Sequence, residues 1–581
     1  MQFPALAPRP RSRETLDAFA GYNHNLRIGE NEFYDMQNLT SRRFPVLSVR
    51  PARGLYGEGL DVRAMVSRDG LCYIDGSCLV INGYRAELGL VGEGPRQLVS
   101  MGAYLIILPD KKYFNTADFS DFGNIEAEFT AQSPVTFTPC QADGTPYKPD
   151  YIQPQQPEAP ENMALWVDTS REPHGLKQYS AAMDLWTGIE TVYIKLSCPG
   201  IGAAFSQYDG VTLTGLGELE NSQLRDLEGA SHLYFRQEDA VVVPGMLDGE
   251  VTVEAPVTLS RKMPAMDFLI ESGNRLWGCR YGPNNAGQVV NELYACALGD
   301  FRNWNSFLGI SSDSYYVSLG ADGPFTGAIA HGGHPLFFRE NCLHKVYGQI
   351  PANFSVQTTP CRGVRKDCAG SLAIVNEILY YLSAYGVCAY DGSLPVEVSA
   401  ALGEQQFEKA VAAAYGSRYY ISMQHRGTHH RSLFVYDTYR GLWHREDDLQ
   451  VTHFCACREE LYCATEDGKI LALQGSGEPW EKSVPWMLET GILGGSLPEK
   501  KYLVKLSLEL SLDPGSRVDI YVRYDSRGEW ISLGHITGRE LRSFTIPVRP
   551  RRCGHLQLRL EGTGYAALHS MTKTYSQGSD V

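Results

Sequence analysis

Long apolar runs are missing from this sequence, and so are the short motifs of several large enzyme classes. No stretch of about 18 apolar residues occurs, which predicts that no helix of the chain spans a membrane. The N-terminal residues lack the charged start and apolar core of a secretory signal, so none is expected there. Neither a G-x-S-x-G nucleophile elbow nor a phosphate-binding loop is present, and catalysis through either motif has no support.

Cysteine is plentiful, but its spacing indicates neither disulfides nor a metal. The 14 cysteines include no C-x-x-C pair and fall along expected strands, as buried free thiols of a reducing cytosol would. The best metal candidate is the alternating row His453, Cys455 and Cys457, with Cys463 nearby. Structural zinc needs four ligands, usually paired around a C-x₂-C knuckle. We therefore predict no metal and no cofactor.

Composition indicates an all-β protein of several domains. Its 58 glycines, 31 prolines and 33 tyrosines favour strands and turns over long helices. A helical apolar period is rare, and residues 404–414 hold the clearest example. At 581 residues the chain exceeds the usual size of one hydrophobic core, so two to four domains are expected.

A hairpin pattern repeats along the chain. Residues 378–382 and 387–390 read as two strands joined by a short turn, and Asp391-Gly392 marks the next turn. Weak copies begin at residues 336, 419 and 461; counted through residue 379 of this hairpin, the steps are 43, 40 and 42 residues. A period in the low forties, built from hairpins, is typical of propeller blades. Stacked hairpins of a β-solenoid remain an alternative, although solenoid coils are usually shorter. We predict a β-propeller of six or seven blades.

Interruptions of this repeat divide the chain into four parts. Six prolines between 139 and 160 indicate a long loop or linker where the repeat stops, and clean alternation near the C-terminus indicates a separate antiparallel sandwich. Apolar residues near the N-terminus follow no period, which suggests a segment that becomes ordered by lying on another surface. The predicted parts are an extended N-terminal arm (1–60), the β-propeller (61–128 and 262–480), an inserted β domain (129–261) and a C-terminal β-sandwich (481–581).

Charge is acidic overall and unevenly distributed. The net charge of −15 disfavours a general nucleic-acid-binding surface, because duplex binding depends on neutralising phosphates. Residues 496–575 nevertheless hold 13 Lys and Arg against 8 Asp and Glu, an excess of +5 that leaves −20 for the rest. Arg549, Arg551 and Arg552 form the densest basic cluster. We predict that these three arginines contact an acidic patch on a neighbouring copy or partner; a solvated loop is the alternative.

Several segments together resemble one family. They are the stretch from Phe19-Ala-Gly-Tyr-Asn23 to Arg53, the pattern Arg275-Leu-Trp-Gly278, Asn291-Glu-Leu-Tyr-Ala295 and Gly299-Asp-Phe-Arg-Asn-Trp304, the hairpin from Ile378 to Gly392, and Gly562-Thr-Gly-Tyr565. These segments resemble phage tail propeller proteins, namely the packaged-DNA stabilisation and tail nozzle proteins of short-tailed phages. The resemblance is spread over most of the chain, and the inserted domain matches least well.

This resemblance implies a structural, non-enzymatic role. Copies would form a ring, expected to be a hexamer, below the portal or head–tail connector, with a distal tail component as a further partner. Packaged DNA would pass through the ring without tight binding, and the protein would not insert into a membrane. It would be made in the host cytoplasm and reside in the tail or neck of the virion. A phage tail protein that binds or degrades host-surface carbohydrate is the alternative, and it would need paired acids at one propeller face.

Overall fold

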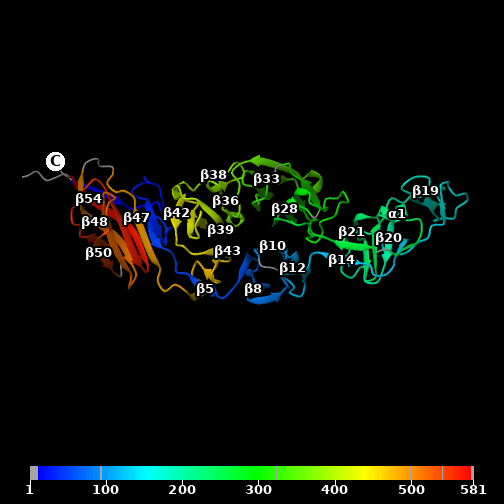
Figure 1. The fold of residues 1–581 in the computed structure, drawn as a ribbon, viewed down its shortest axis with the longest axis horizontal. Coiled ribbons are helices and arrows are strands. Elements are labelled where there is room, and N and C mark those ends of the chain that lie inside the picture. The colour runs from blue at the N-terminus through cyan, green and yellow to red at the C-terminus, as the bar shows by residue number, and fades with distance from the viewer. Residues whose placement is uncertain are drawn as a thin grey trace, which may run out of the picture.

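The computed structural model describes residues 11–91, 94–254, 256–284, 286–320, 323–495, 500–538 and 541–577. Within these ranges almost every element is a strand, and the helical elements are α1 (Ser222–Arg225) and three single 3₁₀ turns, η1 (Pro351–Asn353), η2 (Ala369–Ser371) and η3 (Ala400–Leu402). In the same ranges no helix is long and apolar enough to cross a membrane. Three modules lie in a row, with a sandwich at one end, a propeller in the middle and an insert at the other end (Figure 1).

The propeller has seven blades, each a small antiparallel sheet. Blades 1 to 3 are β6 (Val62–Ser67), β7 (Leu71–Asp75), β8 (Cys78–Ile81) and β9 (Tyr84–Glu87); β10 (Gln97–Met101), β11 (Tyr104–Leu108), β12 (Lys112–Asn115) and β13 (Phe122–Asn124); and β27 (Phe268–Glu271), β28 (Leu276–Pro283), β29 (Val289–Ala295) and β30 (Tyr315–Ser318). Blades 4 and 5 are β31 (Gly327–His331), β32 (His334–Phe338), β33 (Cys342–Tyr347) and β34 (Ser355–Pro360); and β35 (Ala373–Val375), β36 (Ile378–Ser383), β37 (Gly386–Tyr390) and β38 (Val396–Glu397). Blades 6 and 7 are β39 (Phe407–Tyr415), β40 (Arg418–His425), β41 (Arg431–Asp437) and β42 (Leu442–Arg445); and β43 (Val451–Cys457), β44 (Glu460–Thr465), β45 (Ile470–Ala472), β5 (Gly54–Gly57) and β46 (Glu478–Pro479).

Strand β5 closes the propeller. Around the ring, the first strands of successive blades contact one another, except that β31 meets the η2 turn that precedes β35. In blade 7, β5 comes from near the N-terminus and lies between β45 and β46, so that Leu55 pairs with both Leu471 and Glu478. Strands from distant parts of the chain thus close the ring within one blade, and the outer edge that remains, β46, is only two residues long.

The insert extends from blade 2 and returns to blade 3. Its first sheet is β14 (Ala127–Thr130), β26 (Thr258–Arg261), β21 (Gly210–Thr214) and β22 (Gly229–His232), and its second is β23 (Phe235–Gln237), β24 (Ala240–Pro244), β20 (Tyr193–Ser197), β15 (Val135–Cys140) and β25 (Val251–Val253). A third sheet, the tip sheet, is β16 (Tyr151–Gln153), β17 (Leu165–Asp168), β18 (Gly175–Ser180) and β19 (Leu185–Gly188). The first two sheets share an apolar core that contains no propeller residue. The insert therefore has the packing of a separate domain.

The sandwich combines both ends of the chain. One sheet contains β3 (Leu39–Arg43), β4 (Val46–Val49), β54 (Ala566–Gln577), β48 (Lys501–Leu512) and β51 (Arg542–Ile546), with β1 (Arg11–Leu16) on β54 and β52 (Arg552–Cys553) on β48. The other contains β2 (Phe33–Gln37), β47 (Pro485–Thr490), β53 (Leu556–Thr563), β49 (Arg517–Tyr524) and β50 (Ile531–Thr537). One core cluster runs from Tyr419 of blade 6 through Phe33 to Leu508 of the sandwich. Propeller and sandwich are therefore packed as one body.

The predicted fold class is confirmed: an all-β chain with a propeller, an inserted β domain and a C-terminal sandwich. Two local features go beyond what the sequence pattern indicated. The helical period at 404–414 belongs largely to strand β39, because a bulge between Glu408 and Val411 shifts its register on β40 and breaks simple alternation. The N-terminal arm is not an appendage, since residues 11–57 supply five strands to the sandwich and blade 7 of their own chain.

Candidate functional site: the clasp between arm, propeller and sandwich

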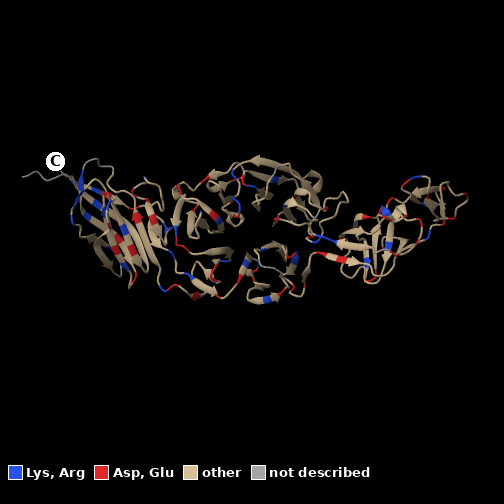
Figure 2. Ribbon diagram, viewed as in Figure 1, with Lys and Arg blue, Asp and Glu red and all other residues tan. Residues whose placement is uncertain are grey.

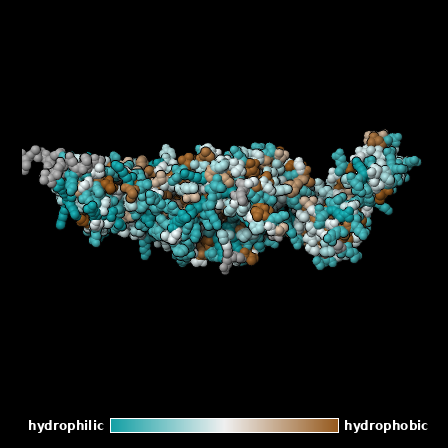
Figure 3. Space-filling model, turned by 45° about the horizontal axis from the view of Figure 1, so that its top comes forward, coloured by the Kyte–Doolittle hydropathy of each residue, from teal (hydrophilic) through white to brown (hydrophobic). Residues whose placement is uncertain are grey.

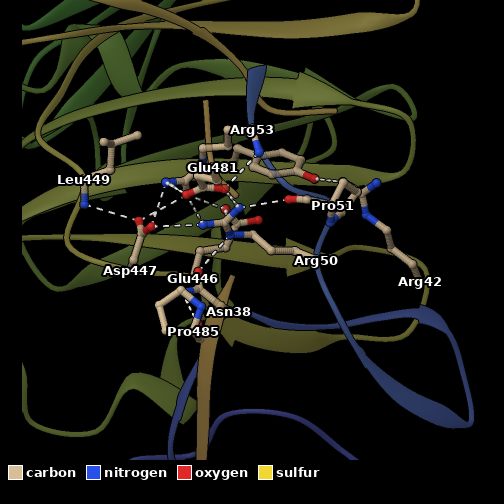
Figure 4. Close-up of polar contacts among 11 residues, drawn as sticks. Asn38, Arg42, Arg50, Pro51, Arg53, Glu446, Asp447, Leu449, Glu481 and Pro485 are labelled. Atoms are coloured by element: carbon tan, nitrogen blue, oxygen red, sulfur yellow. Dashed lines mark hydrogen bonds and ion pairs between the residues drawn. The ribbon is translucent and has the colours of Figure 1, made fainter. Parts of the chain in front are cut away.

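Five charged residues meet where the three parts of the body join (Figure 4). Arg50 and Arg53 lie between β4 of the sandwich and β5 of blade 7. Glu446 and Asp447 follow β42, in the connector from blade 6 to blade 7, and Glu481 lies in the linker from β46 to the sandwich. We call these five residues the clasp. It ties three segments that are far apart in the sequence.

The two arginines share the three carboxylates. Arg53 donates to Asp447 at 2.6 Å and 3.1 Å, and to Glu446 at 2.9 Å. Arg50 donates to both Glu481 oxygens, at 2.7 Å and 2.9 Å, and reaches Asp447 at 3.3 Å. The Arg53 backbone N–H donates to Glu481 at 2.8 Å. Such bidentate contacts fix the orientation of the guanidinium relative to the carboxylate as well as the distance between them.

Burial makes the clasp electrostatically strong. The arginine side chains are only 2% and 1% exposed. Burial opposes ionisation of Asp447, but Arg53 and then Arg50 outweigh it, so the pKa of Asp447 lies below its ordinary value. The same balance, with hydrogen bonds from Arg50, lowers the pKa of Glu481. Burial also opposes the charge of Arg53, yet Asp447 and Glu446 raise the pKa of Arg53 above its ordinary value. All these shifts favour the charged, paired state.

Asn38 extends the clasp into the sandwich. It has a positive φ of 59°, which asparagine tolerates better than most residues. Its side-chain amide donates to the Pro485 carbonyl at 2.8 Å, and its side-chain oxygen accepts from Arg50 Nε at 2.8 Å. Its backbone N–H donates to the Glu446 carbonyl at 2.8 Å. One residue thus joins the arm, the blade connector and the first strand after the propeller.

The arm has a second buried attachment within the sandwich. Lys573 of β54 is fully buried and pairs with Glu30, and its ammonium lies 3.4 Å from Glu14 of β1. Glu30 also accepts from the Gly494 backbone N–H at 2.7 Å. Removing only one member of a buried ion pair is costly, because the other charge is left buried without a partner. The arm is therefore fastened at both ends of its path across the sandwich.

The predicted contact arginines lie away from the clasp, on the sandwich. Arg549 and Arg551 are exposed, whereas Arg552 is half-buried in β52 opposite Tyr502. The Arg551 guanidinium lies 5.7 Å from the ring centre of Tyr524, and the Tyr524 hydroxyl donates to the Arg549 carbonyl at 3.4 Å. Tyr524 is thus contacted by the Arg551 side chain and by the Arg549 backbone. Their predicted contact with an acidic partner stays a prediction.

The cysteine row considered as a metal site is divided between two cores. Cys455 and Cys457 pack between blades 7 and 1, whereas Cys463 packs toward blade 6. Burial raises the pKa of both the Cys455 and Cys463 thiols to about 12, which disfavours the thiolate form that binds metals. Across the described ranges, no group of three or more His, Cys, Asp and Glu side chains is arranged to hold a metal ion.

The inner strands of the propeller offer little to acid–base chemistry. Among the first strands of the seven blades, the acidic residues are Glu271 in blade 3 and Glu408 in blade 6, which are not neighbouring blades. Glu271 accepts from the Asn274 backbone N–H at 2.9 Å, and Glu408 lies 4.0 Å from Arg365. Glycoside hydrolysis usually needs two carboxylates on either side of one bond. These two strands do not supply such a pair.

Comparison with known proteins adds little to this picture. No family model matches the chain, and no curated protein matches it. Among solved structures, an exo-β-1,3-galactanase from Phanerochaete chrysosporium is 9% identical over 52% of this chain and 94% of its own, with a TM-score of 0.21. An acylaminoacyl peptidase is 9% identical over 56% of this chain and 57% of its own, with a TM-score of 0.25. A β-fructofuranosidase from Bombyx mori is 10% identical over 65% of this chain and 88% of its own, with a TM-score of 0.15. Scores this low carry no argument about activity.

The clasp was not found from the sequence. A signal was present, because Arg50-Pro-Ala-Arg53 is basic and Glu446-Asp447-Asp448 is acidic. The two runs are nearly 400 residues apart, and an acidic run more often marks a solvated turn. A single sequence cannot select this pair among the many Arg and Asp combinations.

Proposed function

We propose that this protein is a structural component of a phage virion, one of a ring of copies below the portal that extends or seals the tail channel and retains packaged DNA. The proposal combines the family resemblance of the sequence with the construction of the molecule. In this role the chain acts through shape and stable contacts and performs no reaction. Its partners are further copies, the portal or connector proteins and a distal tail component.

The clasp is the observation that carries the proposal. A ring that retains DNA must keep its subunits in one shape, so the angle between the modules of each subunit must be held. Here the sandwich and propeller share one core, the clasp locks their junction, and the arm strands cross from one to the other. Arg50, Arg53 and Glu446 are buried and Asp447 and Glu481 are partly buried, and we take this ion-pair network to hold the junction in one geometry.

Charge distribution also supports a ring through which DNA passes. Residues 127–261 hold 19 Asp and Glu against seven Lys and Arg, and this acidic insert lies at the opposite end from the sandwich (Figures 1 and 2). Many phosphate contacts would stall a moving duplex, whereas an acidic or neutral wall repels it. The basic excess within the sandwich is then available for contacts between proteins.

Native mass spectrometry of the purified protein, alone and mixed with portal-complex proteins, tests the proposal. The expected result is a closed oligomer, either alone or on the portal complex. A protein that stays strictly monomeric, both alone and with portal-complex proteins, would refute the ring. Binding or cleavage of host-surface glycans by such a monomer would favour the carbohydrate alternative instead.

A further inference from the structure

An exposed apolar knob stands on the tip sheet of the insert. Met163, Met183 and Leu185 are 60%, 64% and 45% exposed, and we call them the tip knob. Met163 comes from the loop before β17, and the other two come from the turn and strand that follow β18. The Met163 backbone N–H donates to the Tyr179 carbonyl at 2.9 Å, and the Ala181 backbone N–H donates to the Asn162 side chain at 3.0 Å. The loop and turn are therefore side by side.

The backbone under the tip knob is strained and well supported. Met163 has a φ of +70°, in the left-handed region that a methionine side chain disfavours. Such strain persists only where the surroundings hold it, and it often marks binding sites. In the same sheet, the Trp186 ring packs 5.4 Å from both Trp166 and Tyr179, measured between ring centres. This aromatic cluster packs the sheet that carries the exposed methionines, and methionine is common on protein-binding surfaces.

The surroundings of the tip knob are acidic. Glu161 and Asp184 are exposed beside it, and the whole insert has an excess of acidic residues. Figure 3 shows apolar residues, in brown, on the outer lobe at the insert end among hydrophilic ones. An apolar centre with an acidic rim fits a partner surface that is apolar with a basic rim.

The sandwich of the same chain has that surface. Ile531 at the start of β50 is 44% exposed and lies opposite Val522, two residues from Tyr524 on β49. The Arg551 guanidinium lies over the Tyr524 ring, the Tyr524 hydroxyl donates to the Arg549 backbone carbonyl, and both arginines are exposed. The sandwich and the tip sheet are at opposite ends of the molecule (Figure 1). One copy therefore cannot bring its own two surfaces together.

We propose that the tip knob of one copy docks on the Ile531–Arg549–Arg551 surface of a second copy. The two surfaces differ, so the contact is heterologous: it closes into a ring if the rotation between copies allows it, and otherwise continues as a filament. This inference rests on the proposed self-assembly and names the surfaces that form it. Arg549 and Arg551 face Glu161 and Asp184, while Ile531 packs against the methionines.

Sedimentation velocity of the full chain over a range of concentrations tests the docking. The first variant combines Met163→Asn, Met183→Gln and Leu185→Gln; asparagine tolerates the positive φ at position 163. We expect at least tenfold weaker self-association, because polar groups replace the apolar centre. The matched control is Val289→Gln, an equally exposed apolar residue (67%) on blade 3, which should associate as the wild type does. Unchanged association of the tip variant would overturn the docking.

Charge reversal tests the pairing of the two surfaces. Arg549→Glu with Arg551→Glu should weaken association, Glu161→Lys should weaken it as well, and mixing the two variant proteins should restore it. Failure of the mixture to associate would overturn the pairing. If tip variants still form rings on portal proteins, the docking is wrong and the proposed function stands. If the wild type self-associates through the tip only into open filaments, and forms no closed ring alone or with portal proteins, the docking stands and the proposed function is wrong.

Discussion

Replacing Arg53 by methionine should release strand β5 from blade 7. Methionine keeps part of the apolar stem but removes the guanidinium, so Glu446, Asp447 and Glu481 are left with Arg50 as their one partner in the clasp. Removing one member of a buried ion pair typically costs about 3–5 kcal/mol, because a charge is left buried without compensation. Arg53 is 1% exposed and contacts three carboxylates, which places it in this class.

Hydrogen exchange of the β5 amides measures this loss directly. A multi-domain chain need not unfold in one step, so a local probe is preferable to a single melting temperature. A cost of about 3 kcal/mol corresponds to roughly a hundredfold faster exchange, since about 1.4 kcal/mol equals a factor of ten. The matched control is Arg517→Met, which breaks a surface pair with Asp519 and should leave β5 unchanged. Equal exchange in the two variants would show that the clasp does not hold β5.

A second variant separates charge balance from loss of contact. Combining Arg53→Met with Asp447→Asn removes one charge of each sign, so the excess of carboxylates falls back to its original value. The double variant should exchange more slowly at β5 than the sum of the two single effects predicts, which is the signature of direct coupling. Strict additivity would mean that Arg53 and Asp447 act independently, contrary to their contact at 2.6 Å.

Three further predictions concern acid stability, domain independence and assembly. Burial lowers the pKa of His444 from 6.5 to about 4, so the free energy of unfolding should fall as the pH falls from 6.5 through 4, because the unfolded state takes up the proton first. In His444→Phe, the melting temperature measured against pH should lose part of that dependence, and an unchanged pH profile would contradict this. Residues 131–257 can be deleted and the paired Thr130 and Thr258 joined by a two-residue turn between β14 and β26. This deletion should leave a soluble, folded propeller, because the insert has its own core. Circular dichroism and thermal unfolding check this, and unfolding of the blades would mean that the insert belongs to the propeller core. Purified protein should bind duplex DNA with a Kd no tighter than about millimolar at physiological salt, and tight, salt-sensitive DNA binding in a filter assay would refute the channel argument. Changing Arg549, Arg551 and Arg552 to Glu should weaken assembly, and high salt should partly reproduce that loss.

Much of the fold could be predicted from strand and turn patterns within short segments of the sequence. Strands such as 378–383 and 386–390 are short, apolar and bounded by turns, so each hairpin is readable from its own residues. Their regular spacing predicted blades because each blade repeats one hairpin geometry within about forty residues. The interruption of that spacing predicted the insert. The physical reason is that hairpin pairing is nearly local, and its turn and alternation signals lie within the paired residues.

Tertiary structure decided what pairs across long separations. The arm strands are individually weak: β1 is half exposed along its length, and β5 is four residues long. Neither strand indicates by itself that its partner lies more than 400 residues away, at Met571 or Leu471. The clasp has the same origin, since Arg53 and Asp447 become partners only after the ring has closed. The apolar pattern and the turns of each hairpin therefore predicted the blades from residues close together in the sequence. Ring closure, the clasp and the course of the arm depend on contacts between distant residues, and nothing in a single sequence indicates that those residues are partners.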